Sequence, residues 1–420
     1  MFWPQQSFES LKTAVLSALN KNASFYDHNI MGLPATYLDP HIFPADADFL
    51  SNAPFIRSFI ENPNHIGLHT YDKSIPSFHG TQQLELDLLR ICAEEIFKAK
   101  PNSYDGYVSP GGTECNIQAV WIFREYFKNK FGALQDEMVI LFSEDTHYSL
   151  YKVCNILGLK YKVLPVDFNE RKIDLDILNN QIKTLKNSGS LYFIIVLNMA
   201  TTMFGSVDDI ESISQKLKAQ EIQFKIHIDA AFGGFIYPFT NPKSLLNFDN
   251  SVVDSISVDG HKMLQAPYGT GIFLIRKGFI DNVLTEEASY VEGLDHTLCG
   301  SRSGANVIAT WMILNVHGSH GILKRMNELI EKTNFLCDSL TQLGIRFFRN
   351  KYMNIVTIRS DDISKEISEK YTLVPEKHEQ NQVWWKIVVM EHVTMDLIQR
   401  FLKDISIYST KHSEMNSISI

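Results

Sequence analysis

The chain has 420 residues, of which 45% are hydrophobic and 21% are charged. This composition is typical of globular proteins and excludes disorder, collagen and coiled coil as descriptions of the whole chain. The net charge is −9 at pH 7 and no long run of Lys or Arg occurs, so nucleic acid is not an expected partner.

The sequence does not predict a membrane protein or a disulfide-rich secreted one. The longest apolar stretch, residues 191–200, is much shorter than the about 20 residues that a membrane-spanning helix needs. The opening residues MFWPQQSFES lack the features of a signal peptide. The five cysteines are widely spread and show no CxxC spacing, so no disulfide framework and no metal site are expected. We therefore expect a cytoplasmic location.

Residues 1–60 are expected to form a mixed lead-in segment that packs on the rest of the protein. An amphipathic helix is predicted near residues 7–20, and a stretch rich in Pro and Asp follows it. Such a stretch is typical of extended chain that lies on another part of the molecule. The first domain is therefore expected to begin near residue 61.

Between residues 80 and 280, helix-like segments alternate with short, almost unbroken apolar runs. These runs occupy residues 138–143, 191–198, 224–230, 252–258 and 271–276. Unbroken apolar runs are typical of strands covered on both faces, and strands separated by helices indicate a mostly parallel α/β sheet. Ligands bind at the carboxyl ends of strands in such sheets, so the residues that follow these runs are candidates for the site.

The C-terminal part of the chain predicts a smaller α+β unit. Strands are expected at residues 354–360 and 383–390, and a helix at residues 393–406. We therefore expect a large domain over residues 61–310 and a small C-terminal domain over residues 311–420.

The first candidate site is a glycine loop before a helix that is expected to end at Gly132. In this loop Gly111 and Gly112 allow a ligand to approach the backbone, and Thr113 adds a hydroxyl group. Backbone N–H groups at a helix N-terminus bind anions. From these residues alone, an ordinary glycine turn is an equal alternative.

Two other candidates follow apolar runs directly. Asp229 ends the run KIHID, and an acid at the end of a buried strand points into a pocket, unless it only caps the next turn. His147 follows the run at residues 138–143, and a single histidine there is more typical of a structural group than of a catalyst.

Lys262 follows His261 at the end of another run and precedes the apolar pair Met263 and Leu264. A lysine by itself is usually a solvated surface charge. Partial burial among apolar neighbours is expected to lower its pKa and make it a usable nucleophile. An anion site, a strand-end acid and a nucleophilic lysine are together the parts that a pyridoxal 5′-phosphate enzyme requires.

The order and wording of these motifs resemble the group II pyridoxal-phosphate decarboxylases, which include glutamate, aromatic amino acid, histidine and tyrosine decarboxylases. The resemblance runs from about residue 60 to about residue 320. It implies an α/β protein with the type I aminotransferase-like fold, in which the large domain holds a mostly parallel seven-stranded sheet. It also implies pyridoxal 5′-phosphate as the cofactor.

The resemblance further implies the roles of individual residues. It places His147 against the pyridine ring, Asp229 at the pyridine nitrogen and Lys262 in a Schiff base with the cofactor. The other cofactor contacts that it implies are Gly111, Gly112, Thr113, Thr201, Thr202, Ala231 and His261. Ala200 stands where the family usually has glycine, so the match is weaker for the two threonines that follow it.

The segment at residues 297–305 resembles the one with which a neighbouring subunit of these enzymes reaches the phosphate. The resemblance therefore implies a homodimer with shared active sites, in which Gly300 and Ser301 come from the partner chain. Just upstream, the position of EEASYVEGLDHT matches the mobile catalytic loop of the family. It implies that Tyr290 or His147 returns a proton to Cα after CO₂ leaves. Core packing is the alternative for Tyr290.

The expected activity is decarboxylation of an L-amino acid to an amine and CO₂. An aminotransferase or a carbon–carbon lyase on the same fold is the alternative. An aminotransferase normally clamps the α-carboxylate with an arginine, and Arg302 and Arg359 are available in the sequence. A cofactor-binding protein without catalysis is disfavoured, because every expected catalytic residue type is present.

The segment at residues 62–85 is expected to line the substrate side of the pocket, unless it only packs the lead-in onto the large domain. Its candidate residues are His65, His69, Tyr71, Phe78, His79 and Gln82. No arginine stands among them to mark an acidic substrate, so the segment favours an aromatic or other uncharged amino acid.

Overall fold

The structure is a computed structural model that describes residues 29, 31, 41, 64–66, 79–285, 294–377 and 383–418. Only the backbone is described for residues 64–66, 79–84, 301, 305, 308, 312, 316 and 409–418. The helix expected near residues 7–20 lies outside these ranges. The described chain divides into two compact units. Residues 29 and 31, Asn334–Phe347 and the described chain from Thr357 onward belong to one unit. The described chain from residue 41 to Thr333, with Phe348–Val356, belongs to the other. The domain boundaries expected near residues 60 and 310 stay predictions.

A seven-stranded sheet forms the centre of the larger unit. In spatial order its strands are β2 (Tyr104–Ser109), β8 (Gly271–Arg276), β7 (Ser255–Asp259), β6 (Gln223–Asp229), β5 (Tyr192–Asn198), β3 (Met138–Ser143) and β4 (Lys160–Leu164). Strand β8 runs antiparallel to both of its neighbours, whereas β7, β6, β5, β3 and β4 pair in parallel. The expected mostly parallel seven-stranded sheet is therefore confirmed.

The predicted runs correspond to five of these strands, and two strands were missed. The runs at residues 138–143 and 271–276 have the observed bounds, and the other three differ by one to three residues at one or both ends. Strand β2 contains Asp105 and Gly106, and edge strand β4 begins with the exposed residues Lys160 and Tyr161. Neither strand is therefore an unbroken apolar run.

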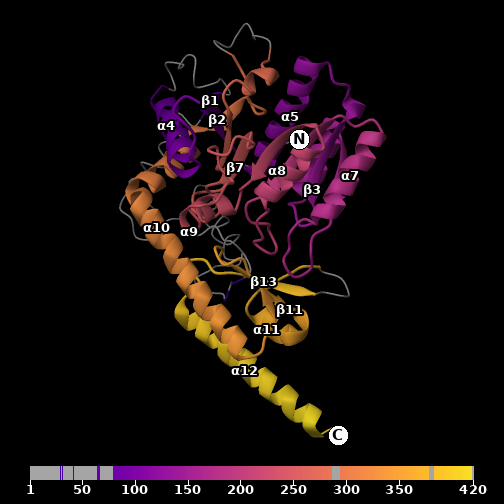
Figure 1. Ribbon diagram of the computed structural model, residues 1–420. Coiled ribbons are helices and arrows are strands. Elements are labelled where there is room, and N and C mark those ends of the chain that lie inside the picture. The colour runs from indigo at the N-terminus through magenta and orange to yellow at the C-terminus, as the bar shows by residue number, and fades with distance from the viewer. Residues whose placement is uncertain are drawn as a thin grey trace, which may run out of the picture. The chain divides into compact units, whose positions relative to one another are not determined.

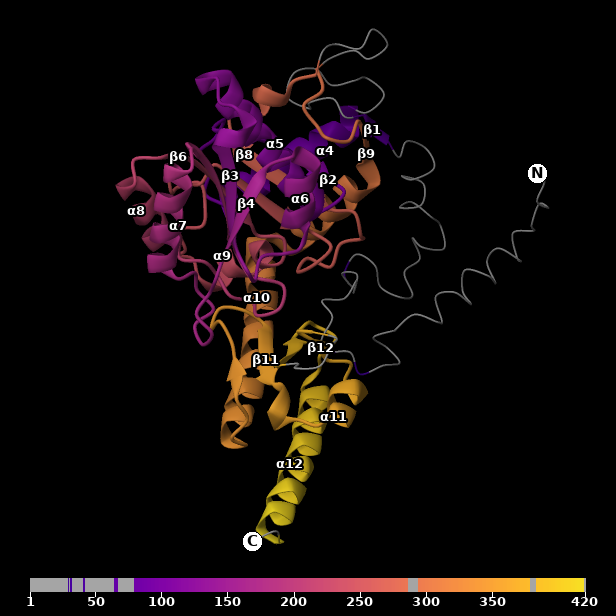
Figure 2. The ribbon, with the colours of Figure 1, turned by 90° about the vertical axis from the view of Figure 1, so that its right-hand side faces the viewer.

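Helices cover the sheet. The helices of the larger unit include α4 (His79–Arg90), α5 (Gly112–Phe131), α6 (Ser149–Leu157), α7 (Leu175–Asn187), α8 (Ile210–Ala219) and the short α9 (Tyr237–Thr240). Helices α7 and α8 lie side by side (Figures 1 and 2). Figure 2 shows β3 and β4 between this pair and α6. The chain also forms short helical turns at Ile91–Ile96, Gln135–Glu137, Gly233–Phe235, Ile280–Val283 and Ser360–Asp362.

Helix α5 packs an apolar face against the sheet. Its residues Phe123 and Phe127 belong to one buried cluster with Phe142 of β3 and Phe273 of β8. The helix ends at Gly132, whose φ of 64° lies in the left-handed region that favours glycine. Burying such aromatic side chains contributes about 1.5–3 kcal/mol each, so the packing of α5 holds its N-terminus in place.

The remaining elements include a four-stranded sheet with the order β10 (Phe347–Phe348), β11 (Ile355–Arg359), β13 (Trp384–Val388) and β12 (Val374–Pro375). Helices α11 (Lys365–Lys370) and α12 (Met395–Ile418) follow in the same part of the chain. The strands expected at residues 354–360 and 383–390 are confirmed. The predicted helix end at residue 406 is wrong, because α12 continues to Ile418.

Two further features bear on the site. Strand β1 (Asn64–Ile66) pairs antiparallel with β9 (Ser301–Ser303), so that Ile66 faces Ser301 in the register. The long helix α10 (Gly304–Gln342) follows β9 and is interrupted at Gly318, whose φ and ψ are 58° and 176°. No helix within the described ranges is both long and apolar enough to cross a membrane.

Candidate active site

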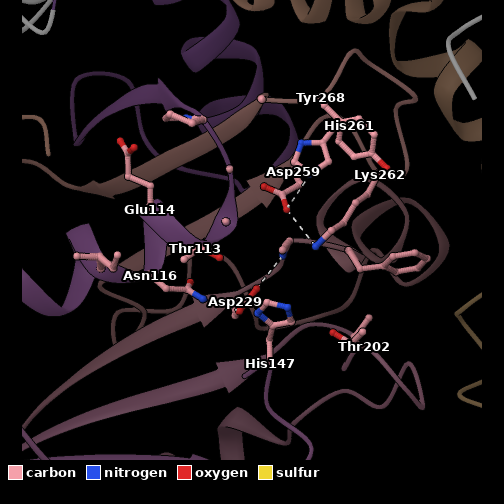
Figure 3. A pocket seen from close by; sticks show the side chains of 18 of the residues that line it. Thr113, Glu114, Asn116, His147, Thr202, Asp229, Asp259, His261, Lys262 and Tyr268 are labelled. Atoms are coloured by element: carbon pink, nitrogen blue, oxygen red, sulfur yellow. Dashed lines mark hydrogen bonds and ion pairs between the residues drawn. The ribbon is translucent and has the colours of Figure 1, made fainter. Parts of the chain in front are cut away.

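A cavity of about 620 Å³ lies at the carboxyl ends of the parallel strands, where the first turn of α5 meets the loops after β3, β5, β6 and β7. Figure 3 shows side chains from these separate segments converging on it. Because the strands end at one edge of the sheet, residues far apart in the chain come together there. The predicted residues Gly111, Gly112, Thr113, His147, Thr201, Thr202, Asp229, Ala231, His261 and Lys262 all line the cavity.

The glycine loop forms a cradle of backbone N–H groups at the start of α5. The N–H groups of Glu114 and Cys115 donate to the carbonyl of Gly111, which places the helix start at the cavity. Strand β8 approaches the loop so closely that a Cβ on Gly271 would lie 2.6 Å from Cα of Gly111. The loop can therefore pack this closely on β8 only because residue 271 is glycine. The loop also presents a helix N-terminus, which is suited to binding a phosphate.

Asp229 lies at the end of β6 with 7% of its surface exposed. Its Oδ2 accepts a hydrogen bond of 2.9 Å from Nδ2 of Asn116, and its Oδ1 accepts one of 3.1 Å from the N–H of Ala231. The carboxylate thus caps the turn that follows β6 and also faces the cavity. Asp229 therefore both points into a pocket and caps the next turn, which were the two alternatives for this residue.

Lys262 is paired with an acid that the sequence did not single out. Its Nζ lies 3.0 Å from Oδ2 of Asp259, which ends β7 and is 4% exposed at its side chain. Burial lowers the pKa of Lys262, but the charges of Asp259 and Asp229 and the hydrogen bond to Asp259 outweigh burial and leave the pKa raised. The expectation of a lowered pKa is therefore wrong for the protein without cofactor, because two carboxylates from adjacent strands surround the ammonium group.

His147 follows β3 and lies in the cavity near Asp229 (Figure 3). Its Nδ1 lies 2.9 Å from Oγ of Ser149 and also accepts a hydrogen bond of 3.3 Å from the N–H of Ser149. Burial lowers the pKa of His147, although the charge of Asp229 opposes this. The ring is therefore held neutral, with Nδ1 as an acceptor.

The loop after β5 brings Thr201 and Thr202 to the cavity. Ala200, which precedes them, has a φ of 78°, in the left-handed region that favours glycine. The family's glycine at this position thus matches the backbone conformation, which alanine adopts here with some strain. Thr201 is buried, and its Oγ1 lies 2.7 Å from Oγ of Ser206.

His261 lies beside the cradle, and a Cβ on Gly111 would lie 3.6 Å from its ring. Its Nε2 is 3.6 Å from Oδ2 of Asp259. Among the described residues, Nδ1 of His261 and Oδ1 of Asp259 are buried without a hydrogen-bond partner. Such unpartnered polar atoms beside an anion cradle are what a bound polar ligand would satisfy.

Sequence reasoning missed several residues of the cavity, namely Glu114, Asn116, Asn198, Asp259, Tyr268 and Cys299. Asp259 could have been identified from the sequence, because it ends a buried strand in the same way as Asp229. No sequence pattern identifies Asn116, because a single asparagine inside a helix does not indicate contact with a strand.

Other predicted residues are not placed in this cavity. Tyr290, His69, Tyr71 and Phe78 lie outside the described residues, and only the backbone is described at His65, His79 and Gln82. In the segment at residues 297–305, Leu298 and Cys299 line the cavity. Gly300 and Ser301 come next in the chain, and their contact with a partner subunit stays a prediction.

Neither arginine considered as a carboxylate clamp supports the aminotransferase alternative. Arg302 forms a two-pronged ion pair with Glu85 and donates to the carbonyl of Val108 at 3.1 Å. Arg359 lies 3.7 Å from Asp361 and 5.0 Å above the ring of Trp384. Both guanidinium groups thus have protein partners.

The cavity has the parts that pyridoxal 5′-phosphate needs. The cradle suits the phosphate, Asp229 suits the protonated pyridine nitrogen, and Lys262 is within the same cavity. Unpartnered atoms of Asp259 and His261 stand beside the cradle. Within the described ranges, no group of three or more His, Cys, Asp or Glu side chains could hold a metal ion.

Comparison with known proteins agrees with this chemistry. Residues 67–357 match the pyridoxal-dependent decarboxylase conserved domain. The chain is 44% identical to tryptophan decarboxylase from Clostridium sporogenes over 98% of this chain and 99% of that protein. It is 31% identical to histidine decarboxylase from Vibrio anguillarum over 65% of this chain and 68% of that protein.

The solved structures support the fold. L-methionine decarboxylase from Streptomyces sp. 590 matches with a TM-score of 0.79 and 19% identity, over 97% of this chain and 96% of that one. Glutamate decarboxylase from Lactobacillus brevis matches with a TM-score of 0.75 and 17% identity, over 97% of this chain and 94% of that one. The cradle, the strand-end acid, the lysine and the matched domain agree, and the chain belongs to the pyridoxal-dependent decarboxylases, whose cofactor is pyridoxal phosphate and whose reaction is amino acid decarboxylation.

Proposed function

We propose that the chain decarboxylates an aromatic L-amino acid, with L-tryptophan as the preferred substrate. The observation that carries this proposal is the 44% identity with a tryptophan decarboxylase over nearly the full length of both chains. The cavity is consistent with it, because Ile117, Phe232, Tyr268 and Leu298 supply apolar and aromatic surface beside the polar groups. Flat apolar surface of this kind suits an indole ring better than a charged side chain.

The described residues suit the parts of a decarboxylation site. When bound, pyridoxal phosphate supplies a sink for the electron pair that is released when the bond between Cα and the carboxylate breaks. The backbone N–H groups of Gly112 and Thr113, in the first turn of α5, would hold the phosphate, while the N–H of Gly111 donates to Oγ of Ser109 at 3.2 Å. The Asp229 carboxylate would keep a proton on the pyridine nitrogen, which maintains the electron demand of the ring.

Proton movement at Lys262 is the second requirement. Only a neutral Nζ has the lone pair needed to attack the cofactor aldehyde, and Asp259 lies within 3.0 Å to accept the proton. Tyr290, which belongs to the segment just before the described residues 294–377, is our candidate to return a proton to Cα. His147 presents Nε2 to the cavity because Nδ1 is occupied by Ser149.

The same proposal includes a homodimer in which Gly300 and Ser301 approach the phosphate of the partner's site. It rests on the resemblance of residues 297–305 to the subunit-bridging segment of the family, and on the position of Leu298 and Cys299 at the cavity. The cytoplasmic location expected from the sequence stays a prediction.

The test is a substrate panel with purified, cofactor-loaded protein. L-tryptophan, tyrosine, phenylalanine, histidine, methionine, glutamate and aspartate are each supplied, and amine, CO₂ and keto acid are measured by mass spectrometry. We expect tryptamine and CO₂ from tryptophan, with the highest kcat/KM of the panel. Lys262→Ala should abolish the product, whereas Lys183→Ala, at an exposed lysine of α7, should not. A higher kcat/KM for an acidic amino acid contradicts the aromatic assignment, and a keto acid product contradicts decarboxylation.

A further inference from the structure

The side chain of Asn116 has all of its hydrogen-bonding capacity used inside the protein. It lies one turn after Gly112 on α5 and is 1% exposed. Its Nδ2 donates to Oδ2 of Asp229 at 2.9 Å and to Oγ of Ser149 at 3.1 Å. Its Oδ1 accepts from Nε2 of His227 at 2.9 Å and from Oγ of Ser257 at 3.3 Å. An amide offers two donor hydrogens and two acceptor lone pairs, so no capacity is left over.

The partners determine which way this amide faces. The carboxylate of Asp229 only accepts hydrogen bonds, so the NH₂ group must face it, and Oδ1 must face His227. His227 is fully buried, and its Nδ1 lies 2.7 Å from Oγ of Ser255. Nε2 of His227 must therefore carry the proton, while Nδ1 accepts from the Ser255 hydroxyl. Burial lowers the pKa of His227 to about 4, so the ring stays neutral at physiological pH.

A second branch runs from the same amide to His147. Because Ser149 Oγ accepts from Asn116, its own hydrogen is free to point to Nδ1 of His147, 2.9 Å away. The N–H of Ser149 also donates to this nitrogen. Both contacts need a lone pair on Nδ1, so the neutral His147 ring carries its proton on Nε2. Figure 3 shows Asn116, Asp229 and His147 next to one another in the cavity.

We propose that Asn116 is a positioning residue that couples the two groups facing the cofactor ring, by orienting the ionised Asp229 carboxylate and by setting, through Ser149, the Nε2–H tautomer of His147. This inference rests on the proposed cofactor site, and it assigns a role to a residue that is itself outside the reacting atoms. The helix that begins at the phosphate cradle thus also orders the polar groups around the ring, one turn later.

The discriminating variant is Asn116→Asp, which keeps the size of the side chain and its acceptor facing His227. It replaces the donor to Asp229 with a second carboxyl group, and two carboxyl groups at about 3 Å cannot both be ionised. The pair then shares one proton, so Asp229 holds the pyridine proton less firmly. Loss of a hydrogen bond to a charged group changes an equilibrium by about 10- to 100-fold.

The experiment loads the variant with cofactor labelled with ¹⁵N in the pyridine ring and records the ring-nitrogen chemical shift against pH. We expect the ring nitrogen to lose its proton at a lower pH than in the wild type, and kcat to fall about 10- to 100-fold. Asn247→Asp is the matched control, because Asn247 is 6% exposed and its amide contacts Ser244 and Asp249 instead. A wild-type ring-nitrogen titration in Asn116→Asp would overturn the proposal.

A second measurement needs no variant of Asn116. In full-length, cofactor-loaded protein with ¹⁵N-labelled histidine, His147 should show a protonated Nε2 and an unprotonated Nδ1 at pH 7, with its signal assigned by His147→Gln. A proton on Nδ1 would overturn the proposal even if Asn116→Asp fails to fold. Both readouts are made without substrate, so they remain valid if no amino acid of the panel is decarboxylated.

Discussion

The buried ion pair between Glu85 and Arg302 offers a quantitative test of how the edge of the large sheet is closed. Glu85 of α4 is 0% exposed and Arg302 of β9 is 4% exposed. Between them they satisfy the free edge of β2 at Val108, because Glu85 accepts from its N–H at 2.7 Å and Arg302 donates to its carbonyl at 3.1 Å. The pair therefore takes the place of one residue of a neighbouring strand, at a position three residues before Gly111 of the cradle.

The magnitude follows from what each substitution leaves behind. Glu85→Met leaves the Arg302 guanidinium buried without its counter-charge, and Arg302→Met leaves Glu85 in the same condition. Breaking a buried pair from one side costs about 3–5 kcal/mol, so the two single losses sum to about 6–10 kcal/mol. The double variant leaves neither charge of the pair buried without its partner. It loses the two hydrogen bonds to Val108, at about 1–3 kcal/mol each, and the contact of the Arg302 guanidinium with the Tyr107 ring. We therefore expect it to cost several kcal/mol less than the sum.

The assay is urea unfolding of the cofactor-free wild type, both single variants and the double variant, followed by tryptophan fluorescence and circular dichroism. The free energies of unfolding form a double-mutant cycle, which isolates the coupling between the two side chains. Additivity within about 0.5 kcal/mol would refute the reasoning, because it would mean that neither charge depends on the other.

Three further predictions concern the site. Asp259→Asn removes a charge that raises the pKa of Lys262, so the rate at which the protein captures the cofactor should reach its plateau at a lower pH. Stopped-flow absorbance measures this rate against pH, and an unchanged pH profile would contradict the prediction. Burial lowers the pKa of His227 to about 4, so the unfolded chain binds a proton near pH 6.5 that the folded chain does not. Stability should therefore fall by about 2 kcal/mol between pH 7 and pH 5, and His227→Gln should remove this part of the urea-unfolding pH dependence. Gly271→Ala would place a Cβ 2.6 Å from Cα of Gly111, so the cradle must shift and the cofactor should bind more weakly. Equilibrium dialysis measures this affinity, and an unchanged affinity would contradict the prediction.

The sequence predicted well those features that short-range patterns encode. The strands at Met138–Ser143 and Gly271–Arg276 are buried on both faces, so their apolar runs coincide with their bounds. Asp229 and Lys262 stand at or just after strand ends, which is where a parallel sheet gathers its ligand-binding groups. The family resemblance supplied the cofactor and the reaction.

Features that depend on neighbours in space were missed or wrong. The pKa of Lys262 was predicted from its apolar neighbours in the chain, but Asp229 on an adjacent strand and Asp259 at the end of β7 determine it. Glu85 and Arg302 are 217 positions apart, so no local pattern joins them. Asn116 resembles any polar residue of a helix until the sheet places Asp229 and His227 beside it.

The central claim is that this cavity removes the carboxylate of an amino acid by means of Lys262. The most direct measurement supplies L-tryptophan labelled with ¹³C in its carboxyl group to the cofactor-loaded wild type and to Lys262→Ala. The account predicts labelled CO₂ and unlabelled tryptamine in equal amounts from the wild type, and neither from the variant. Labelled carboxylate retained in a keto acid, or equal turnover by Lys262→Ala, would contradict it.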